Sequence, residues 1–222
     1  MIEAWVSVGS NVGDSRQVLS EASRMLALLA DIDWRVSSIY VSEPWGGIEQ
    51  RSFLNQVVRL KISHRHMISF AEKLFIEIGS LDEPEHHSWP QPRMSLLKEL
   101  SEIAHEVKPS APHIPLDFRW AECLLDLLLA AERLLGRERS PDQERWGPRV
   151  IDLDLLAVTR GVPQGDPYQS DRLTLPHPEL HRRNFVLEPW AEISPELILP
   201  VLNRSVRELW EGSDDSGELH KL

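Results

Sequence analysis

Apolar and polar residues alternate along several short stretches of the chain. Side chains of a strand point to opposite faces in turn, so this alternation is typical of a strand with one buried face. The stretches that show it, or that have an apolar run of strand length, are residues 2–8, 34–41, 53–62, 150–158 and 184–187. Turn-forming residues separate them, so we expect them to pair as strands of a sheet.

Apolar residues at helical spacing predict three helices between these strands. They are residues 15–29, 120–135 and 203–211. Asp14 is expected to cap the first helix, with Gln17 as its reciprocal partner in a capping box. Gly136 is expected to end the second, because glycine readily adopts the left-handed conformation that often follows a helix. This order of elements predicts an α+β fold, a ferredoxin-like α/β sandwich with a mostly antiparallel sheet.

Residues 64–119 interrupt this order and are predicted to form a largely helical insertion in a single domain spanning residues 1–222. Residues 65–79 and 95–107 look helical, and each is followed by proline-rich sequence. We expect the insertion to lie away from the site of chemistry and to serve a protein partner or self-association. The tail from Gly212 is polar and is expected to fray.

Charge and composition narrow the class of protein. The chain has 222 residues, of which 41% are hydrophobic, and its formal net charge of −11 disfavours nucleic acid, whose phosphates it would repel. The single cysteine, Cys123, cannot form an internal disulfide, as is typical of a reducing compartment. We see no secretory signal after Met1, and Asp126 interrupts the longest apolar stretch, so we expect a soluble cytoplasmic protein without membrane contact.

Two aspartates stand two positions apart in an apolar strand that follows an arginine-rich turn. The sequence there reads Arg145-Trp146-Gly147-Pro148-Arg149-Val150-Ile151-Asp152-Leu153-Asp154. Alternation places the carboxylates of Asp152 and Asp154 on one face of the strand. Such a pair suits Mg²⁺, which keeps its other positions for water and phosphate. An Asp-x-Asp pair alone more often marks solvent-facing acids, but the rigid Gly-Pro turn and its arginines favour a metal site.

Four arginines fall within thirteen positions of this acidic chain. They are Arg137, Arg139, Arg145 and Arg149. Basic residues at a helix end can simply complement the helix dipole. Their density here favours a mobile loop that folds over phosphates, excludes water and stabilises charge on a transferring phosphoryl group.

Phe53 and Asn55 share one face of their predicted strand. The simpler interpretation is an exposed aromatic ring beside a polar neighbour. Together, however, they could stack on a flat heterocycle and hydrogen-bond its edge, with Phe185 as the opposite wall.

His177, in a proline-bounded turn, is a weaker candidate for contact with a phosphate or base. The glycines around Asn11 lack phosphate-loop spacing, so we interpret Gly9 and Asn11 as a structural turn and cap.

Four motifs occur in order along the chain. They are Gly9-Ser10-Asn11 with Gly13-Asp14; Ser37-Ser38-Ile39-Tyr40 through Pro44 and Gly46 to Phe53-Leu54-Asn55; Gly136-Arg137 through Arg145-Trp146-Gly147-Pro148-Arg149 to Asp152-Leu153-Asp154; and Leu175-Pro176-His177-Pro178 through Arg183 to Phe185-Val186-Leu187. Together they resemble the 6-hydroxymethyl-7,8-dihydropterin pyrophosphokinase family, and the third motif is highly specific. The resemblance covers residues 1–62 and about 120–200. It implies an enzyme of folate biosynthesis that transfers pyrophosphate from ATP to a pterin alcohol and releases AMP.

The resemblance also implies roles for matching residues. Asp152 and Asp154 would hold two Mg²⁺ ions and, with Arg137 and Arg149, carry catalysis. The residues that would bind ATP are Arg137, Arg139, Arg149, Arg172, Thr174, His177 and Arg183. The residues that would bind the pterin are Ser42, Glu43, Trp45, Phe53, Asn55, Trp146 and Phe185. No strong general base is evident for the pterin hydroxyl.

Two other functions stay open on the sequence alone. One is another Mg²⁺-dependent phosphoryl or nucleotidyl transferase on the same scaffold, with a different flat acceptor. The other is a non-catalytic subunit that binds a pterin or a nucleotide. The intact set of aspartates and arginines argues against a non-catalytic subunit, and the identity of the products would distinguish the two enzymes.

Overall fold

The computed structural model describes most of the chain outside the predicted insertion. The described residues are 2–27, 29–30, 33–45, 49–62, 116–139, 146–159, 168–199 and 201–222. The predicted helices at 65–79 and 95–107 lie outside them, as does Arg145. The predicted insertion at 64–119 overlaps the described residues only where α4 begins.

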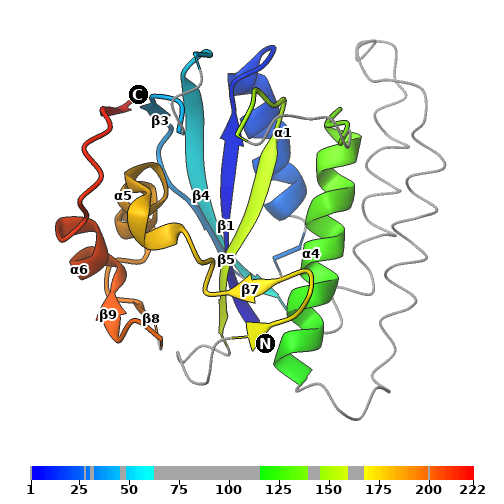
Figure 1. Cartoon of the computed structure of the whole chain (residues 1–222). Helices are drawn as coiled ribbons and strands as arrows, with labels where there is room; N and C mark the ends of the chain where they lie inside the picture. The colour runs from blue at the N-terminus through cyan, green and yellow to red at the C-terminus, as the bar shows by residue number, and fades with distance from the viewer. Residues whose placement is uncertain are drawn as a thin grey trace.

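A six-stranded sheet with helices on both faces forms the fold (Figure 1). Its strands are β1 (Ile2–Ser10), β2 (Trp34–Val36), β3 (Tyr40–Ser42), β4 (Phe53–Ile62), β5 (Asp152–Thr159) and β10 (Leu219–Lys221). Neighbouring strands follow the order β10-β3-β4-β1-β5, and β2 also pairs with β4. Every pairing in this sheet is antiparallel. The prediction of a mixed fold with a largely antiparallel sheet is therefore confirmed.

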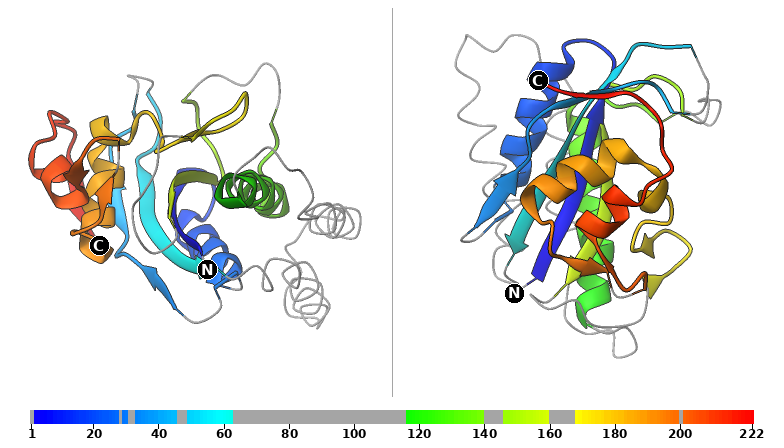
Figure 2. Two further views of the ribbon diagram at one scale, coloured as in Figure 1. Left: turned by 90° about the horizontal axis from the view of Figure 1, so that it is seen from below. Right: turned by 90° about the vertical axis from the view of Figure 1, so that its left-hand side faces the viewer.

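Helices form a layer on each face of the sheet (Figure 2). The helices are α1 (Ser15–Ala27), α4 (Leu116–Leu134), α5 (Asn184–Ile193) and α6 (Val206–Glu211). The first two cover one face, and α5 and α6 cover the other. The smaller elements are the 3-10 helix η1 (Leu180–Arg182) and two ribbons, β6 (Tyr168–Gln169) with β7 (Thr174–Leu175) and β8 (Ile198–Leu199) with β9 (Arg204–Ser205). None of the described helices is long and apolar enough to cross a membrane.

The central strand β1 contributes to a hydrophobic core on each face. Val6 and Val8 pack in the core beneath α1 and α4, whereas Trp5 packs in the core beneath α5 and α6. The Trp5 ring lies 6.2 Å from that of Trp190 in α5, and its Nε1 donates to Ser194 Oγ at 3.0 Å. Alternation along one strand thus fixes both layers, because each successive side chain enters the opposite core.

Helix-end signals are partly confirmed. The Asp14 carboxylate accepts a hydrogen bond from Gln17 N at 3.0 Å, as predicted for a cap. The reciprocal half of the capping box is wrong, because the Gln17 side chain donates to Glu21 instead. Gly136 follows α4 with a φ of 90°, the left-handed conformation expected of it.

The single strand predicted at 34–41 is two strands, β2 and β3, separated by three residues. Ser37 explains the interruption. Its Oγ accepts from Val57 N at 3.0 Å, and its backbone N donates to Val57 O at 3.0 Å. The serine side chain thus takes the place of a backbone acceptor in the ladder, which ends regular pairing there.

Two predictions for the C-terminal third are wrong. Residues 184–187 begin helix α5 rather than a strand, because Val186, Leu187 and Trp190 recur at helical spacing on the face that packs beneath β1. The tail does not simply fray: after α6 it returns to the sheet, where β10 pairs with β3. The predicted helix at 203–211 is shorter, since residues 204 and 205 form β9.

Replacement of Val58 by alanine should destabilise the fold. Val58 is fully buried in β4, so the lost methyl groups leave a cavity, and we expect a loss of about 2 kcal/mol in the free energy of unfolding. Val201→Ala is the matched control, because Val201 is 48% exposed and should change that value by less than about 0.5 kcal/mol. Urea unfolding measures both, and equal effects would contradict the assignment of the core.

Candidate active site

A cavity of ≈ 490 Å³ collects most of the predicted site residues. Its lining residues are Ser7, Gly9, Ser42, Glu43, Trp45, Phe53, Asn55, Arg137, Arg139, Trp146, Arg149, Asp152, Asp154, His177, Arg183 and Phe185. Every predicted site residue is among them except Arg172 and Thr174. Arg172 forms an ion pair with Asp126 of α4, and Thr174 lies in the β6–β7 ribbon opposite Gln169.

Small residues of β1 leave room beside the paired aspartates. In the antiparallel register, Asp154 lies opposite Ser7 and Asp152 lies opposite Gly9. A Cβ added at Gly9 would meet Asn55 Oδ1 at 3.4 Å, so a side chain there would crowd the cavity. We interpreted Gly9 from the sequence as part of a turn, but it is a strand residue and lines the cavity with Ser7. The sequence feature that could have revealed this is that Ser7 and Gly9 are small and stand among the bulky residues of β1.

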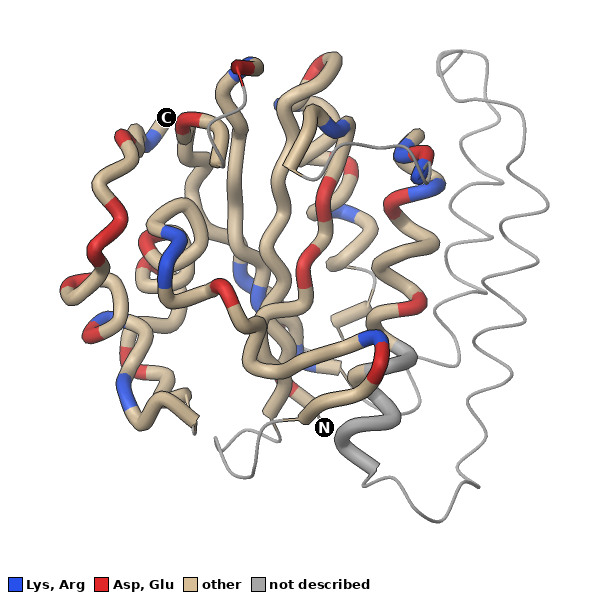
Figure 3. Tube along the Cα trace, viewed as in Figure 1, with Lys and Arg blue, Asp and Glu red and all other residues tan. Residues whose placement is uncertain are grey.

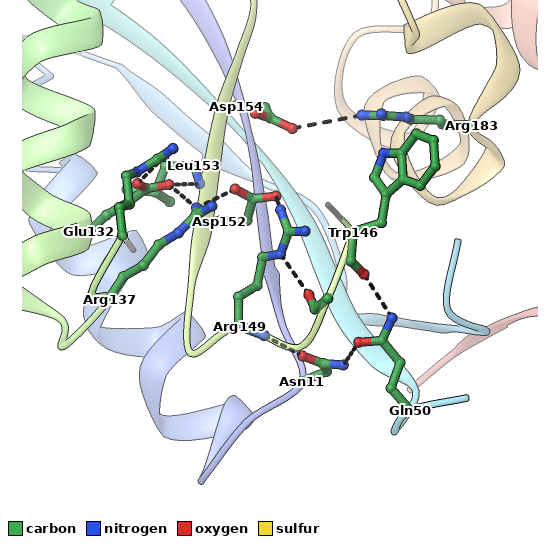
Figure 4. A network of polar contacts seen from close by, with 12 residues as sticks. Asn11, Gln50, Glu132, Arg137, Trp146, Arg149, Asp152, Leu153, Asp154 and Arg183 are labelled. Carbon is green, nitrogen blue, oxygen red and sulfur yellow. Dashed lines mark hydrogen bonds and ion pairs between the residues drawn. The ribbon is translucent and has the colours of Figure 1, made fainter. Parts of the chain in front are cut away.

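Asp152 is the centre of a carboxylate–guanidinium network (Figure 4). One oxygen pairs with Arg137 and the other accepts from Arg149 Nη1 at 2.7 Å. Figure 3 shows the charges behind this network, with acidic positions along β5 and basic positions at the C-terminal end of α4 and just before α5. Asp154 has a more distant partner, Arg183 Nη1, at 3.8 Å.

Glu132 of α4 anchors the same arginines from behind. Only 1% of its side chain is exposed, and it accepts from Arg137 Nη1 at 2.6 Å, from Arg139 Nη2 at 2.5 Å and from Leu153 N at 2.8 Å. Burial raises the pKa of Glu132, while the two guanidinium groups oppose that shift. Glu132 was not among the site residues predicted from the sequence. The sequence feature that could have revealed it is its position four residues after Leu128, which places an acidic side chain on the apolar face of the helix.

The two aspartates differ in their electrostatic surroundings. Burial and the adjacent Asp152 charge raise the pKa of Asp154 well above its usual range, and the arginines at positions 183 and 149 partly offset this. The Asp154 side chain is nevertheless 37% exposed, on the side facing the cavity. A carboxylate in this environment gains from a nearby positive charge, as a divalent cation would provide.

The Asn11 side chain links the end of β1 to the turn before β5 and to the residues just before β4. Its Oδ1 accepts from Arg149 N at 2.9 Å, and its Nδ2 donates to Gln50 Oε1 at 2.9 Å and to Arg51 O at 3.0 Å. Gln50 Nε2 in turn donates to Trp146 O at 2.8 Å. Asn11 therefore has a structural role, as expected, but the expected cap is wrong, because its side chain fixes the backbone of the turn that carries Trp146 and Arg149 and the cap of α1 is made by Asp14.

The other end of the cavity has flat and amide side chains. The rings of Trp45 and Phe185 meet edge to face, 6.1 Å apart, and Arg183 lies over the Phe185 ring at 5.8 Å. Asn55 is 2% exposed, and its Nδ2 donates to Ser42 Oγ at 2.9 Å, which fixes the amide. Phe53 lines the same space. Such a pocket suits a planar polar ring.

His177 faces the cavity as a neutral imidazole. Burial, followed by the charge of Arg183, lowers the pKa of His177 to about 4, and the acids at positions 179 and 152 oppose that shift. Its Nδ1 accepts from Glu179 N at 3.3 Å. The proton of the neutral ring is therefore on Nε2, which can donate to an oxygen of a ligand.

The donor set fits a divalent cation that shares its coordination with a polyphosphate. The described residues contain no cluster of three or more histidine, cysteine or acidic side chains that could hold a metal by themselves. Asp152 and Asp154 provide two carboxylates, and Mg²⁺ commonly takes one or two from protein and the rest from phosphate and water. Arg137 Nε and Arg183 Nε are buried and have no hydrogen-bond partner in the described part of the chain. Both are donors available to an anion.

The cavity combines paired carboxylates, several arginines and a pocket for a planar ring. This combination is suited to the metal-assisted transfer of a phosphoryl-type group from a nucleotide to a flat acceptor.

Comparison with known families identifies that class more closely. A sequence model of the 7,8-dihydro-6-hydroxymethylpterin-pyrophosphokinase family matches residues 5–88 and 116–195. The chain therefore belongs to this family. The unmatched interval, residues 89–115, lies within the predicted insertion.

Relatives match over nearly the whole chain. A protein of Methylorubrum extorquens is 31% identical over 220 residues, which cover 98% of this chain and 97% of the relative. A protein of Synechocystis is 42% identical over 213 residues, covering 95% of this chain and 76% of the relative. One of Mycobacterium bovis is 29% identical over 234 residues, covering 100% and 91%. Each is named 2-amino-4-hydroxy-6-hydroxymethyldihydropteridine pyrophosphokinase.

Acidification should destabilise the fold through His177. The neutral form is favoured in the folded protein, so between pH 6.5 and about 4 the unfolded chain binds the additional proton and the free energy of unfolding falls as pH falls. In His177→Gln this contribution is lost, and the slope of that free energy against pH should be smaller over the same window. Urea unfolding across the window measures both slopes. Identical slopes would show that His177 is not held neutral.

Proposed function

We propose that this cavity is where the chain performs the reaction of its family, the transfer of pyrophosphate from ATP to 6-hydroxymethyl-7,8-dihydropterin with release of AMP. The observation that carries the proposal is the division of one cavity into a carboxylate–arginine end and an aromatic–amide end. A polyphosphate suits the first end and a pterin ring the second. We also infer from the strand order that the fold is the ferredoxin-like sandwich expected from the sequence.

Asp152 and Asp154 are the residues that would hold Mg²⁺, and two ions are expected. A bound cation supplies neutralisation of phosphate charge and a lower pKa for the attacking hydroxyl. The aspartates contribute by their fixed spacing on β5, because Asp152 and Asp154 face the cavity while Leu153 is buried in the core.

Arginines bind and orient the transferred group. Arg137 and Arg149 each donate to Asp152, and Arg137 and Arg139 to Glu132, so carboxylates hold the guanidinium groups close to the positions where phosphate oxygens would bind. Two oxygens of an ATP phosphate can accept from a guanidinium group as the two oxygens of a carboxylate do, so a phosphate can replace Asp152 as the partner. Because the guanidinium groups are already oriented, little reorganisation is needed as charge develops on the pyrophosphoryl group.

The aromatic end positions the acceptor. Phe53 and Phe185 would stack on the pterin ring and Asn55 would hydrogen-bond its edge, while the backbone from Ser42 to Trp45 completes the pocket. Trp146 also lines the cavity and would cover the ring. His177 would donate from Nε2 to the nucleotide, and Arg183 would do the same from its guanidinium group.

Some predictions from the sequence stay predictions. Roles for Arg172 and Thr174 in ATP binding have no support from the cavity, which neither residue lines. The insertion at 64–119 as a partner surface or self-association surface concerns residues that lie mostly outside the described part of the chain.

Incubation of the purified protein with ATP, Mg²⁺ and the reduced pterin alcohol should yield AMP and the pterin diphosphate in equal amounts. Separation of the nucleotides by chromatography measures this. ADP as the product, or free pyrophosphate without a modified pterin, would contradict the proposed reaction and favour a different transferase on the same scaffold.

Arg149→Ala should lower kcat by roughly 10²–10³-fold, because contacts to developing charge are often worth about 3 kcal/mol or more. Arg207→Ala is the matched control, since that arginine is exposed and pairs with Glu196 far along the chain from the cavity residues. Circular dichroism checks that both variants fold. Turnover that falls equally in both variants, or in neither, would contradict a role for Arg149 in the transfer.

A further inference from the structure

The C-terminal tail contacts both walls of the proposed pterin pocket. After α6, residues 213–222 run past α5 and return to the edge of the sheet as β10 (Figures 1 and 2). The family sequence model ends at residue 195, so it does not account for this segment. We call residues 213–222 the tail clasp, for the contacts that follow.

Asp215 makes the first contact, at the start of α5. Its Oδ2 accepts from Asn184 N at 2.8 Å, and its backbone carbonyl accepts from Asn184 Nδ2 at 2.6 Å. The residue at the N-cap position, Arg183, makes no side-chain cap of its own. The carboxylate of Asp215 therefore satisfies a free N–H at the positive end of the helix dipole, from a position 31 residues further along the chain. Asn184 lies between Arg183 and Phe185, which both line the cavity.

Strand β10 makes the second contact, on the opposite wall. Leu219 pairs with Ser42 and Lys221 pairs with Tyr40, and Leu222 N donates to Ile39 O at 2.9 Å. Ser42 is the last residue of β3. The chain then continues into the cavity-lining positions 43 and 45.

A third contact ties these two walls to each other. Lys221 Nζ lies 3.3 Å from Glu192 Oε2 of α5, and Tyr40 of β3 donates to the same carboxylate at 2.8 Å. The tail clasp thus joins β3 to α5 at one end and holds the first turn of α5 at the other. Trp45, three residues after the end of β3, and Phe185 of α5 both line the cavity and are in edge-to-face contact.

Protection of the sheet edge from pairing with another strand would explain only the β10–β3 contact. A short strand that covers a sheet edge prevents unwanted pairing and needs no contact with a helix start. The carboxylate at the start of α5 is a separate contact, made four residues before β10 begins, and it falls beside the two residues of α5 and its cap that line the cavity.

We propose that the tail clasp sets the spacing of the two walls that hold the planar ring, with Asp215 as a positioning residue for Phe185. This inference rests on the proposed function, in which those walls bind the pterin. The clasp therefore tunes affinity for a bicyclic heterocycle, whereas the carboxylate–arginine end is built by other segments.

Asp215→Ala should raise KM for the pterin alcohol by about fivefold. The contact that caps α5 is lost, so Phe185 is positioned less well and the ring binds more weakly. KM for ATP and kcat should change far less, because Arg183 keeps its partner Asp154 and the Asp152 network does not touch the tail. Asp215→Asn retains an oxygen acceptor for the Asn184 amide and should recover part of the loss. Asp214→Ala is the matched control, since the neighbouring carboxylate is exposed.

The same kinetics on Phe185→Ala separate the two proposals. If Phe185→Ala leaves KM for the pterin unchanged, the assignment of the pocket itself fails. If Phe185→Ala raises it but Asp215→Ala matches Asp214→Ala, the pocket stands and the clasp is overturned. A rise in both Michaelis constants together with a loss of kcat would mean general destabilisation and would also overturn the clasp.

Discussion

The rest of the site depends on how one aspartate is held. Asp152 accepts from Arg137 and Arg149, and Glu132 holds Arg137 and Arg139 from behind while also accepting from the backbone of β5. Glu132 and Arg137 are buried, and buried charges are tolerated only when they are paired, so each of these groups fixes the position of the next. Removing one partner would leave a charge uncompensated, which is why the site and the helix that carries Glu132 form one unit.

The fold provides this network through alternation on its central strands. On β1, and on β5 as far as Leu155, every second residue enters the core beneath α1 and α4, and the residues between face the cavity or the core beneath α5. A register shift follows on β5, where Leu156 and Ala157 both enter the core beneath α5. Ser7 and Gly9 are small where Asp152 and Asp154 need space, and Trp5 is large where α5 packs. One strand therefore sets the position of the chemistry and of the helix that forms the opposite wall.

Local patterns in the sequence predicted most of this, because alternation and cap residues act over a few positions. Strand β5, its paired carboxylates and the cavity face of Phe53 and Asn55 followed from period-two alternation. Contacts between distant segments were not predictable in this way. Glu132 accepts from Leu153 N, which lies 21 residues further along the chain, and the pairing of β10 with β3 joins segments farther apart still. Helix α5 was misread as a strand because only three apolar residues, Phe185 to Leu187, were considered, although the helical spacing continues to Trp190.

We expect the guanidinium groups held by carboxylates to change partners when the nucleotide binds. The decisive measurement is a crystal structure of the protein with Mg²⁺ and a nonhydrolysable ATP analogue. In that structure Asp152 and Asp154 should turn to the metal while Arg137 and Arg149 contact the phosphates. An unchanged pair of Asp152 with both arginines, with the nucleotide bound elsewhere, would contradict this expectation.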